Sequence, residues 1–488
     1  MHKKIFFCLA ILIGVLAAGF FVHKESQSCT GPGISEAGRN NIKAGSIFPA
    51  PGRTSYNMKL YLDAGNRIVY GKTHLKTVNT STQKLQELWF TAYPNAFKDK
   101  ANTPAPASAY FNGFNPGWMK ITAITVNSQK VVPEEQGISI RVGLPGAIKP
   151  GQAVEVVIQW EIKIPQASYR YGSNRSIYML GNFYPALNLL TSDGWHNSYN
   201  SVFGDPFCFP CADYHMEINI PQGYELVSTG ENQDTIAVDS GREIHLVKAL
   251  NARDFCMVVV YDYSKVSSGF QNTSLRCYAP PGAMDKARQV LEQSRDIFNY
   301  YACTFGSYPY KEFKIVFVPM KGFHGMEYSG IIFLREEFLN TSSDSRENEF
   351  LLAHEIAHQW WYSVVGNDQV KEPWLDEGLA NWSAYKYLYE RKGQKPPPES
   401  HKPAGIKLTR ELKEIYSAQE YYGTAYTGGE AFWFGLEDEL GSEQVIKVLR
   451  RYYADFQYGI ATTDDLKNCI QVEAHKNMDQ YFQRWFED

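Results

Sequence analysis

Short runs of alternating apolar and polar residues, separated by turn-forming residues, occupy the chain from about residue 55 to residue 278. Alternation with a period of two is typical of strands that bury one face of a sheet. The predicted strands are 56–62, 67–78, 85–92, 154–164, 214–220 and 255–260. Segment 95–118 is rich in Pro, Ala, Asn and Gly and is predicted to be a surface loop. We therefore expect a predominantly antiparallel β-rich domain over residues 55–278.

The spacing of apolar residues changes near residue 283. Residues 283–305 carry apolar side chains at helical intervals, and helical patterns dominate from there to residue 488. Two short apolar runs, 314–318 and 331–334, predict a small sheet inside this second part. The sequence thus predicts an α+β protein of several domains, with a mostly helical domain over residues 279–488.

The N-terminus is set aside from these domains because it has the pattern of a membrane-directed segment. Lys3 and Lys4 precede 18 uncharged, mostly apolar residues, 5–22. This length lies between a cleavable signal and a transmembrane anchor, and the apolar run continues past the possible cleavage site at Ala17. We predict an anchor or signal segment over 1–23, an anchor being favoured, and a linker over 24–54. The protein would then be a single-pass protein of the cell membrane with its folded part outside the cytoplasm, or alternatively a secreted one.

The composition argues against one class of partner but does not determine the role of the cysteines. With 488 residues, 44% of them hydrophobic, the chain can bury full-sized cores. A net charge of -4 and the lack of a long basic run argue against binding to nucleic acid. Eight cysteines include the close pair Cys208 and Cys211, which suits a local disulfide, a redox pair or half of a metal site, a structural role being favoured.

The strongest chemical signal is the segment His354-Glu355-Ile356-Ala357-His358. It lies in a predicted helix, 349–365, that is free of Pro and Gly until Gly366. Two histidines four residues apart project from one helical face, as two imidazoles that share a metal ion must. Glu355 lies about 100° around the helix, where it can meet a water at the metal without being a ligand. The alternative is a pair of histidines that are merely hydrogen-bonded in a helix core.

A catalytic zinc ion needs a third protein ligand, and Glu377 is the candidate. Between it and His358 lie 18 residues, and it stands at the start of a second predicted helix, 374–389. Gly366 and Pro373 allow the chain to reverse between the two helices and to bring Glu377 against the histidines. The alternative is a solvated carboxylate near a helix N-terminus, where the helix dipole favours it.

These segments resemble those of the M1 family of gluzincin metallopeptidases, the zinc aminopeptidases that include leukotriene A4 hydrolase. The resemblance rests on the segments HEIAHQWW and WLDEGLA, on Gly325-Met326-Glu327 upstream, and on Tyr426 followed by Gly429 downstream. It implies that the β-rich domain is followed along the chain by a thermolysin-like, mostly helical catalytic domain that contains a small sheet. It also implies a short form of the family, without the further helical C-terminal domain that many members have.

The resemblance implies a role for each matching residue around one catalytic Zn²⁺ ion. His354, His358 and Glu377 would bind zinc, and Glu355 would be the general base for a zinc-bound water. Tyr426 would donate to the oxyanion. The family usually has Tyr-x-Lys-Gly where this chain has Tyr426-Thr-Gly-Gly, yet Tyr426 is preferred over the neighbouring tyrosines because a glycine and a helical run follow it. Asp376 and Asn381 are both candidates for the second shell, in which oxygen atoms accept hydrogen bonds from the metal-bound imidazoles. The sequence does not decide between them.

The substrate-binding residues implied by the family segment are Gly325, Met326 and Glu327. In aminopeptidases of this family the segment runs beside the substrate like an edge strand, and its glutamate pairs with the protonated α-amine. This chain keeps Met326 and Glu327 but has His324 and Tyr328 where the family has Gly and Asn.

The sequence thus predicts a zinc metallopeptidase, an aminopeptidase that hydrolyses the N-terminal peptide bond of peptides by attack of a zinc-bound water. Its partners would be peptides with a free N-terminus and, through the N-terminal segment, the membrane. One alternative is a zinc endopeptidase of thermolysin type, which does not require Glu327. Another is a catalytically inactive peptide-binding module, although such a module would not need Glu355 beside the metal.

Overall fold

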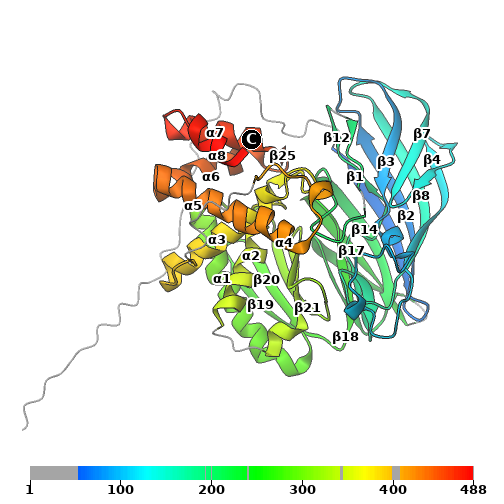
Figure 1. The fold of residues 1–488 in the computed structure, drawn as a ribbon. Helices are drawn as coiled ribbons and strands as arrows, with labels where there is room; N and C mark the ends of the chain where they lie inside the picture. The colour runs from blue at the N-terminus through cyan, green and yellow to red at the C-terminus, as the bar shows by residue number, and fades with distance from the viewer. Residues whose placement is uncertain are drawn as a thin grey trace, which may run out of the picture. The chain divides into compact units, whose positions relative to one another are not determined.

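The structure, a computed structural model, describes residues 53–192, 194–198, 200–238, 241–340, 345–397 and 407–486 (Figure 1). The predicted anchor or signal segment 1–23 and nearly all of the linker 24–54 lie outside these residues. Within the described part of the chain, no helix is both long enough and apolar enough to cross a membrane. The membrane association therefore stays a prediction.

The first part of the described chain is built on an eight-stranded sheet. In spatial order its strands are β16 (Glu231–Val238), β17 (Arg242–Ala252), β14 (Ala212–Pro221), β1 (Ser55–Asp63), β2 (Ile68–Val78), β8 (Ala153–Lys163), β4 (Trp118–Val126) and β5 (Gln129–Lys130). Its neighbouring strands are antiparallel except for β1 and β14, which are parallel. Alternate residues of β1 are buried, as the sequence pattern predicts.

Two four-stranded sheets and a short hairpin complete the β-rich part. One sheet contains β11 (Ala186–Leu187), β3 (Leu85–Thr91), β7 (Ser139–Ile148) and β6 (Glu134–Gln136). The other contains β15 (Tyr224–Ser228), β18 (Met257–Tyr261), β10 (Ile177–Leu180) and β9 (Tyr171–Asn174), and the hairpin is β12 (Leu190–Thr191) with β13 (Gly194–Trp195). The predicted loop 95–118 overlaps the 3₁₀ turns Tyr93–Phe97 and Ala107–Ala109 and ends where β4 begins.

A five-stranded sheet follows and supports the helices. Its spatial order is β19 (Ser264–Phe270), β20 (Thr273–Ala279), β21 (Glu312–Val318), β23 (Ile331–Arg335) and β22 (Gly325–Tyr328). The predicted runs 314–318 and 331–334 are thus strands of one sheet, and β22 is an edge strand antiparallel to β23. The sheet also pairs strands from both sides of the predicted domain boundary at residue 278, because β20 runs parallel to β21.

The remaining elements are mostly helices: α1 (Met284–Thr304), α2 (Arg346–Ala357), α3 (Trp374–Lys392), α4 (Ala418–Tyr421), a π-helix (Tyr422–Gly428), α5 (Gly429–Leu440), α6 (Ser442–Phe456), α7 (Thr463–Ala474) and α8 (Asp479–Phe486). A two-stranded pairing joins β24 (Gly366–Asn367) to β25 (Ile460–Ala461). The α+β fold predicted from the sequence is confirmed.

Helix α2, which carries His354, ends earlier than predicted. We expected a helix over 349–365, but α2 ends at Ala357 and His358 is its C-terminal cap. Beyond it the backbone turns, and Tyr362 adopts a φ of 138°, which no α-helix contains. The β-rich part holds this turn, because Arg253 Nε donates to the carbonyl oxygen of Tyr362 at 2.6 Å and the Tyr362 hydroxyl donates to Asp254. These long-range contacts override the local helical propensity of the segment.

Two glycines allow α3 and α5 to cross closely. A Cβ atom added to Gly378 would overlap the backbone of Gly429, and one added to Gly429 would overlap Gly378. Larger residues would push the helices apart. The crossing therefore brings the start of α3, with Glu377, next to the π-helix that ends at Gly428.

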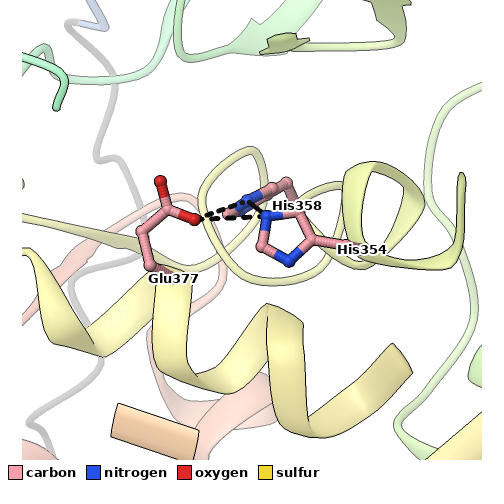
Figure 2. A group of neighbouring side chains, drawn as sticks. All are labelled: His354, His358 and Glu377. Carbon is pink, nitrogen blue, oxygen red and sulfur yellow. Dashed lines mark hydrogen bonds and ion pairs between the residues drawn. The ribbon is translucent and has the colours of Figure 1, made fainter. Parts of the chain in front are cut away.

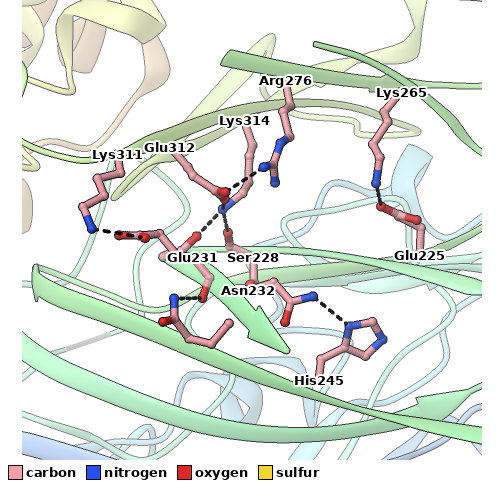
Figure 3. A network of polar contacts seen from close by, with 12 residues as sticks. Glu225, Ser228, Glu231, Asn232, His245, Lys265, Arg276, Lys311, Glu312 and Lys314 are labelled. Carbon is pink, nitrogen blue, oxygen red and sulfur yellow. Dashed lines mark hydrogen bonds and ion pairs between the residues drawn. The ribbon is translucent and has the colours of Figure 1, made fainter. Parts of the chain in front are cut away.

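A buried polar network joins the five-stranded sheet to the β-rich part (Figure 3). Lys314 on β21 is buried, and its Nζ donates to the carbonyl oxygen of Ser228 at 2.9 Å and pairs with Glu312 at 2.8 Å. Arg276 on β20 pairs with the same carboxylate at 2.8 Å. Burial lowers the pKa of Lys314, and the charge of Glu312 opposes that effect.

Candidate metal centre

Three buried side chains from α2, its cap and α3 converge on one point (Figure 2). The Nε2 atoms of His354 and His358 are 3.1 Å apart. Oε2 of Glu377 lies 3.2 Å from Nε2 of His354 and 3.4 Å from Nε2 of His358. The structure thus brings together the three residues that the sequence spacing predicts as ligands.

The dimensions of this triangle fit a zinc ion. Zinc bound to imidazole nitrogen at about 2.0–2.1 Å in a tetrahedral site separates neighbouring ligand atoms by about 3.3 Å, close to all three sides observed. Oε2 of Glu377 is buried without a hydrogen-bond partner in the described chain, as expected of an atom reserved for a cation. Two imidazole nitrogens and one carboxylate oxygen are a donor set typical of catalytic zinc, which keeps a fourth position open.

The outer contacts of these side chains fix their orientation. Nδ1 of His358 donates to the carbonyl oxygen of Trp361 at 3.0 Å, so Nε2 is the ring atom that faces the candidate metal position. Although burial opposes its ionisation, the neighbouring His354 and His358 lower the pKa of Glu377. The Glu377 carboxylate is therefore charged.

Of the two candidates for the second shell, Asn381 lies against His354, because burial lowers the pKa of this histidine and a side-chain hydrogen bond with Asn381 opposes that effect. Asp376 accepts hydrogen bonds from the side chains of Asn367 at 3.1 Å and Gln369 at 2.7 Å. Asn381 donates to Glu430 on α5 at 2.7 Å. Both residues therefore hold α3 against its neighbours.

Glu355 lies on α2 beneath the edge strand β22. A Cβ atom added to Gly325 would overlap the carboxylate of Glu355, so the glycine of the family-like segment is the residue that leaves room for this side chain. Glu355 is buried, and its Oε2 has no hydrogen-bond partner within the described residues. Burial raises the pKa of Glu355 to about 8. A carboxyl group so placed is suited to exchange a proton near neutral pH.

Tyr426 is the tyrosine that reaches the triad. Its hydroxyl donates to Oε1 of Glu377 at 2.6 Å, and its ring stacks on that of His354 with centroids 5.8 Å apart. Burial and the charge of Glu377 raise the pKa of Tyr426 well above its usual range, so the phenol stays protonated and can donate. By contrast, Tyr422 is half exposed, and Tyr421 is buried against Gly204. The π-helix thus presents the residue that the sequence comparison preferred.

Gly325, Met326 and Glu327 form most of the edge strand β22, as the family segment implies. All three line a cavity of about 380 Å³ that also contains His354, Glu355, Glu377 and Tyr426. Glu327 is buried, and burial raises its pKa well above the usual range, as does the negative charge of Asp205 and of Glu377. This end of the cavity therefore favours a cationic group.

Sequence reasoning missed Asp205 and its partner Arg170. Oxygen atoms of Asp205, Glu327 and Glu377 lie within 4.8 Å of one another, and Asp205 also forms a buried ion pair with Arg170. Asp205 lies in an irregular segment between β13 and β14, far in sequence from the histidines. No motif surrounds it, so only the folded chain reveals that it belongs to this cavity.

Cys208 and Cys211 are free thiols in this structure. Their Sγ atoms point to backbone carbonyl oxygens, that of Asn367 at 3.6 Å and that of Ser363 at 3.9 Å, and burial raises the pKa of both thiols. Among the described residues, no possible metal-binding group contains either cysteine. They pack the β-rich part against the turn that follows α2.

Comparison with known proteins agrees with this geometry. Residues 283–485 match the peptidase family M1 domain. Aminopeptidase M1-B of rice (Oryza sativa subsp. japonica) is 24% identical over 312 residues, which are 57% of this chain and 35% of that protein. Endoplasmic reticulum aminopeptidase 2 of Bos taurus is 24% identical over 309 residues, 54% of this chain and 32% of that protein. The matches thus span about a third of these relatives.

The fold also resembles solved structures. A crystal structure of an M1 zinc metallopeptidase from Deinococcus radiodurans superimposes with a TM-score of 0.62 and 16% identity, covering 91% of this chain and 96% of that one. A mutant of the same protein, solved with a Tyr-Ser-Ala substrate, superimposes with a TM-score of 0.62 and 15% identity over the same shares of both chains. These likenesses support the arrangement of a β-rich part followed by a mostly helical part.

Proposed function

We propose that this chain, whose residues 283–485 match the peptidase family M1 domain, is a zinc-dependent aminopeptidase that removes the N-terminal residue of peptides. The observation that carries the proposal is the acidic end of the cavity, where carboxylates gather beside the three candidate metal ligands. Glu327 and Asp205 lie there beside Glu377, so the α-ammonium of a peptide can bind next to the metal position. An endopeptidase would instead place an uncharged stretch of peptide backbone against these carboxylates, which leaves them without a cationic partner.

The residues around the triad supply the remaining chemistry. Bound zinc would act as a Lewis acid toward the scissile carbonyl and would acidify the attacking water. Glu355 would take the proton from that water and pass it to the leaving amine. Tyr426 would donate its hydroxyl proton to the oxygen on which negative charge develops. Glu327 would bind the α-ammonium of the substrate through a charge-assisted hydrogen bond.

Metal removal is the first test of this proposal. The purified protein is expected to contain zinc, and incubation with a chelator such as 1,10-phenanthroline is expected to abolish peptide hydrolysis, because two neutral imidazoles and one carboxylate do not polarise a carbonyl by themselves. Metal analysis by mass spectrometry and an activity assay before and after re-addition of Zn²⁺ provide the measurement. Full activity of a zinc-free preparation would refute the proposal.

Acetylation of the substrate amine tests the role of Glu327. Wild type should cleave a peptide with a free N-terminus and leave its N-acetylated form intact. Glu327→Ala should lower kcat/KM on the free peptide at least about tenfold, because hydrogen bonds to charged groups contribute about 1.5–3 kcal/mol. Zinc content should not change.

The matched control is Glu443→Ala, which removes an exposed carboxylate at the start of α6. This control should keep the wild-type preference for the free amine. Cleavage of both peptides at internal bonds by wild type would instead support the thermolysin-type endopeptidase. Binding without cleavage of either peptide would support the inactive peptide-binding module.

A further inference from the structure

A second cavity continues from the metal centre on the side away from Asp205. It has a volume of about 710 Å³ and shares His354, Glu355 and Tyr426 with the first cavity. Its lining includes Phe350 and Leu351 of α2 and Tyr385 of α3. We refer to it as the outer cavity. If the acidic end holds the substrate amine, the residues after the cleaved bond must lie in the outer cavity.

The ionisable residues of the outer cavity beyond the metal centre are mostly basic. They are Arg335 at the end of β23, Arg346 at the start of α2, His324 before β22, and the exposed carboxylate Glu347. Arg335 is half-buried, and within the described part of the chain neither arginine forms an ion pair. Arg346 is oriented by a hydrogen bond from Nη2 to the carbonyl oxygen of Lys395. Two guanidinium groups that form no close ion pair with a described carboxylate therefore border this cavity, although the charge of Glu337 acts on Arg335 from a greater distance.

The strand register gives the separation between the acidic and basic ends. Gly325 of β22 pairs with Leu334 of β23, so Arg335 lies opposite His324 and its backbone N–H donates to the His324 carbonyl oxygen. His324 precedes Glu327 by three residues, which is about 10 Å along an extended strand. A peptide lying along the edge strand β22 would cover this distance with about three residues.

From this arrangement we propose that Arg335 and Arg346 bind the C-terminal carboxylate of short peptides, so that the preferred substrates are tripeptides and tetrapeptides with both termini free. The inference rests on the proposed aminopeptidase function, since it uses Glu327 to place the amine. Guanidinium groups suit the role because their N–H donors match the two oxygens of a carboxylate. Charges of opposite sign at the two ends of the cleft would also orient a zwitterionic peptide as it enters.

Amidation of the substrate C-terminus provides the test. At low salt, wild type should cleave Ala-Ala-Ala with about tenfold higher kcat/KM than Ala-Ala-Ala-amide, which corresponds to about 1.4 kcal/mol. The ratio should fall toward one at about 1 M salt, where screening acts within about 3 Å. For an alanine-based decapeptide the acid and amide forms should be cleaved equally, because its C-terminus lies beyond the arginines.

The double variant Arg335→Gln/Arg346→Gln should bring the ratio for the tripeptide to about one. The control Arg288→Gln, which changes an exposed arginine on α1, should keep the wild-type ratio, and a thermal melt of each variant checks folding. An acid-to-amide ratio near one in wild type, or a high ratio that survives in the folded double variant, would overturn the proposal. If wild type instead cleaves no free-amine peptide at all, the aminopeptidase function itself fails, and the two failures are thereby distinguished.

Discussion

Glu355→Gln is expected to lower kcat by at least about 10²-fold, since proton transfer by a positioned side chain contributes about 10²–10⁴ to the rate. The substitution keeps the shape of a buried side chain that has no room to move toward Gly325. It removes only the ability to accept a proton. The measurement is kcat on a free-amine tripeptide, together with the zinc content of the variant.

Two controls separate loss of the base from loss of the site. Zinc content should equal that of wild type, because Glu355 lies outside the ligand triad. Glu443→Gln, at an exposed position on α6, should leave kcat unchanged. Wild-type turnover by Glu355→Gln would remove this residue from the mechanism.

Tyr426→Phe is expected to reduce kcat by about 10²–10³, or roughly 2.7–4 kcal/mol, with little change in KM. The substitution deletes the hydroxyl that lies 2.6 Å from Glu377 but keeps the ring that stacks on His354. Zinc should remain bound because its three ligands are intact. Steady-state kinetics on a tripeptide, with metal analysis, provide the measurement.

The neighbouring tyrosines give the comparison for this variant. Tyr416→Phe changes an exposed residue and should have no effect on kcat. If Tyr421→Phe or Tyr422→Phe abolished turnover while Tyr426→Phe did not, the assignment of the oxyanion donor would be wrong.

The sequence predicts those features of the fold that depend on local pattern. Period-two alternation locates β1, β2 and β8 to within one residue at either end, because each strand buries one face. The spacing of His354, His358 and Glu377 predicts the ligand triad because two helices and one chain reversal suffice to assemble it. In each case the information lies within a short stretch of chain.

Features that depend on contacts between distant segments could not be predicted. The end of α2 at Ala357 is determined by Arg253 and Asp254, which lie about a hundred residues earlier and bind the turn at Tyr362. Asp205 reaches the cavity through an irregular segment without periodicity. A single sequence gives no signal for either contact. The residue types and their spacing around these positions form no pattern that points to a distant partner.

The π-helix at Tyr422–Gly428 has a consequence for how the Tyr426 hydroxyl is placed. A π-turn closes hydrogen bonds between residues five apart, one more than in an α-helix, so it holds one extra residue per turn. If that residue were removed, the side chains that follow it would be rotated by about 100° around the helix axis relative to those that precede it. The side of the helix on which the Tyr426 side chain lies therefore depends on the number of residues between Tyr421 and the close crossing at Gly429. A change of side-chain rotamer could not replace this effect. Loop-grafting or domain-swapping experiments on this segment must therefore conserve its length before they conserve its composition.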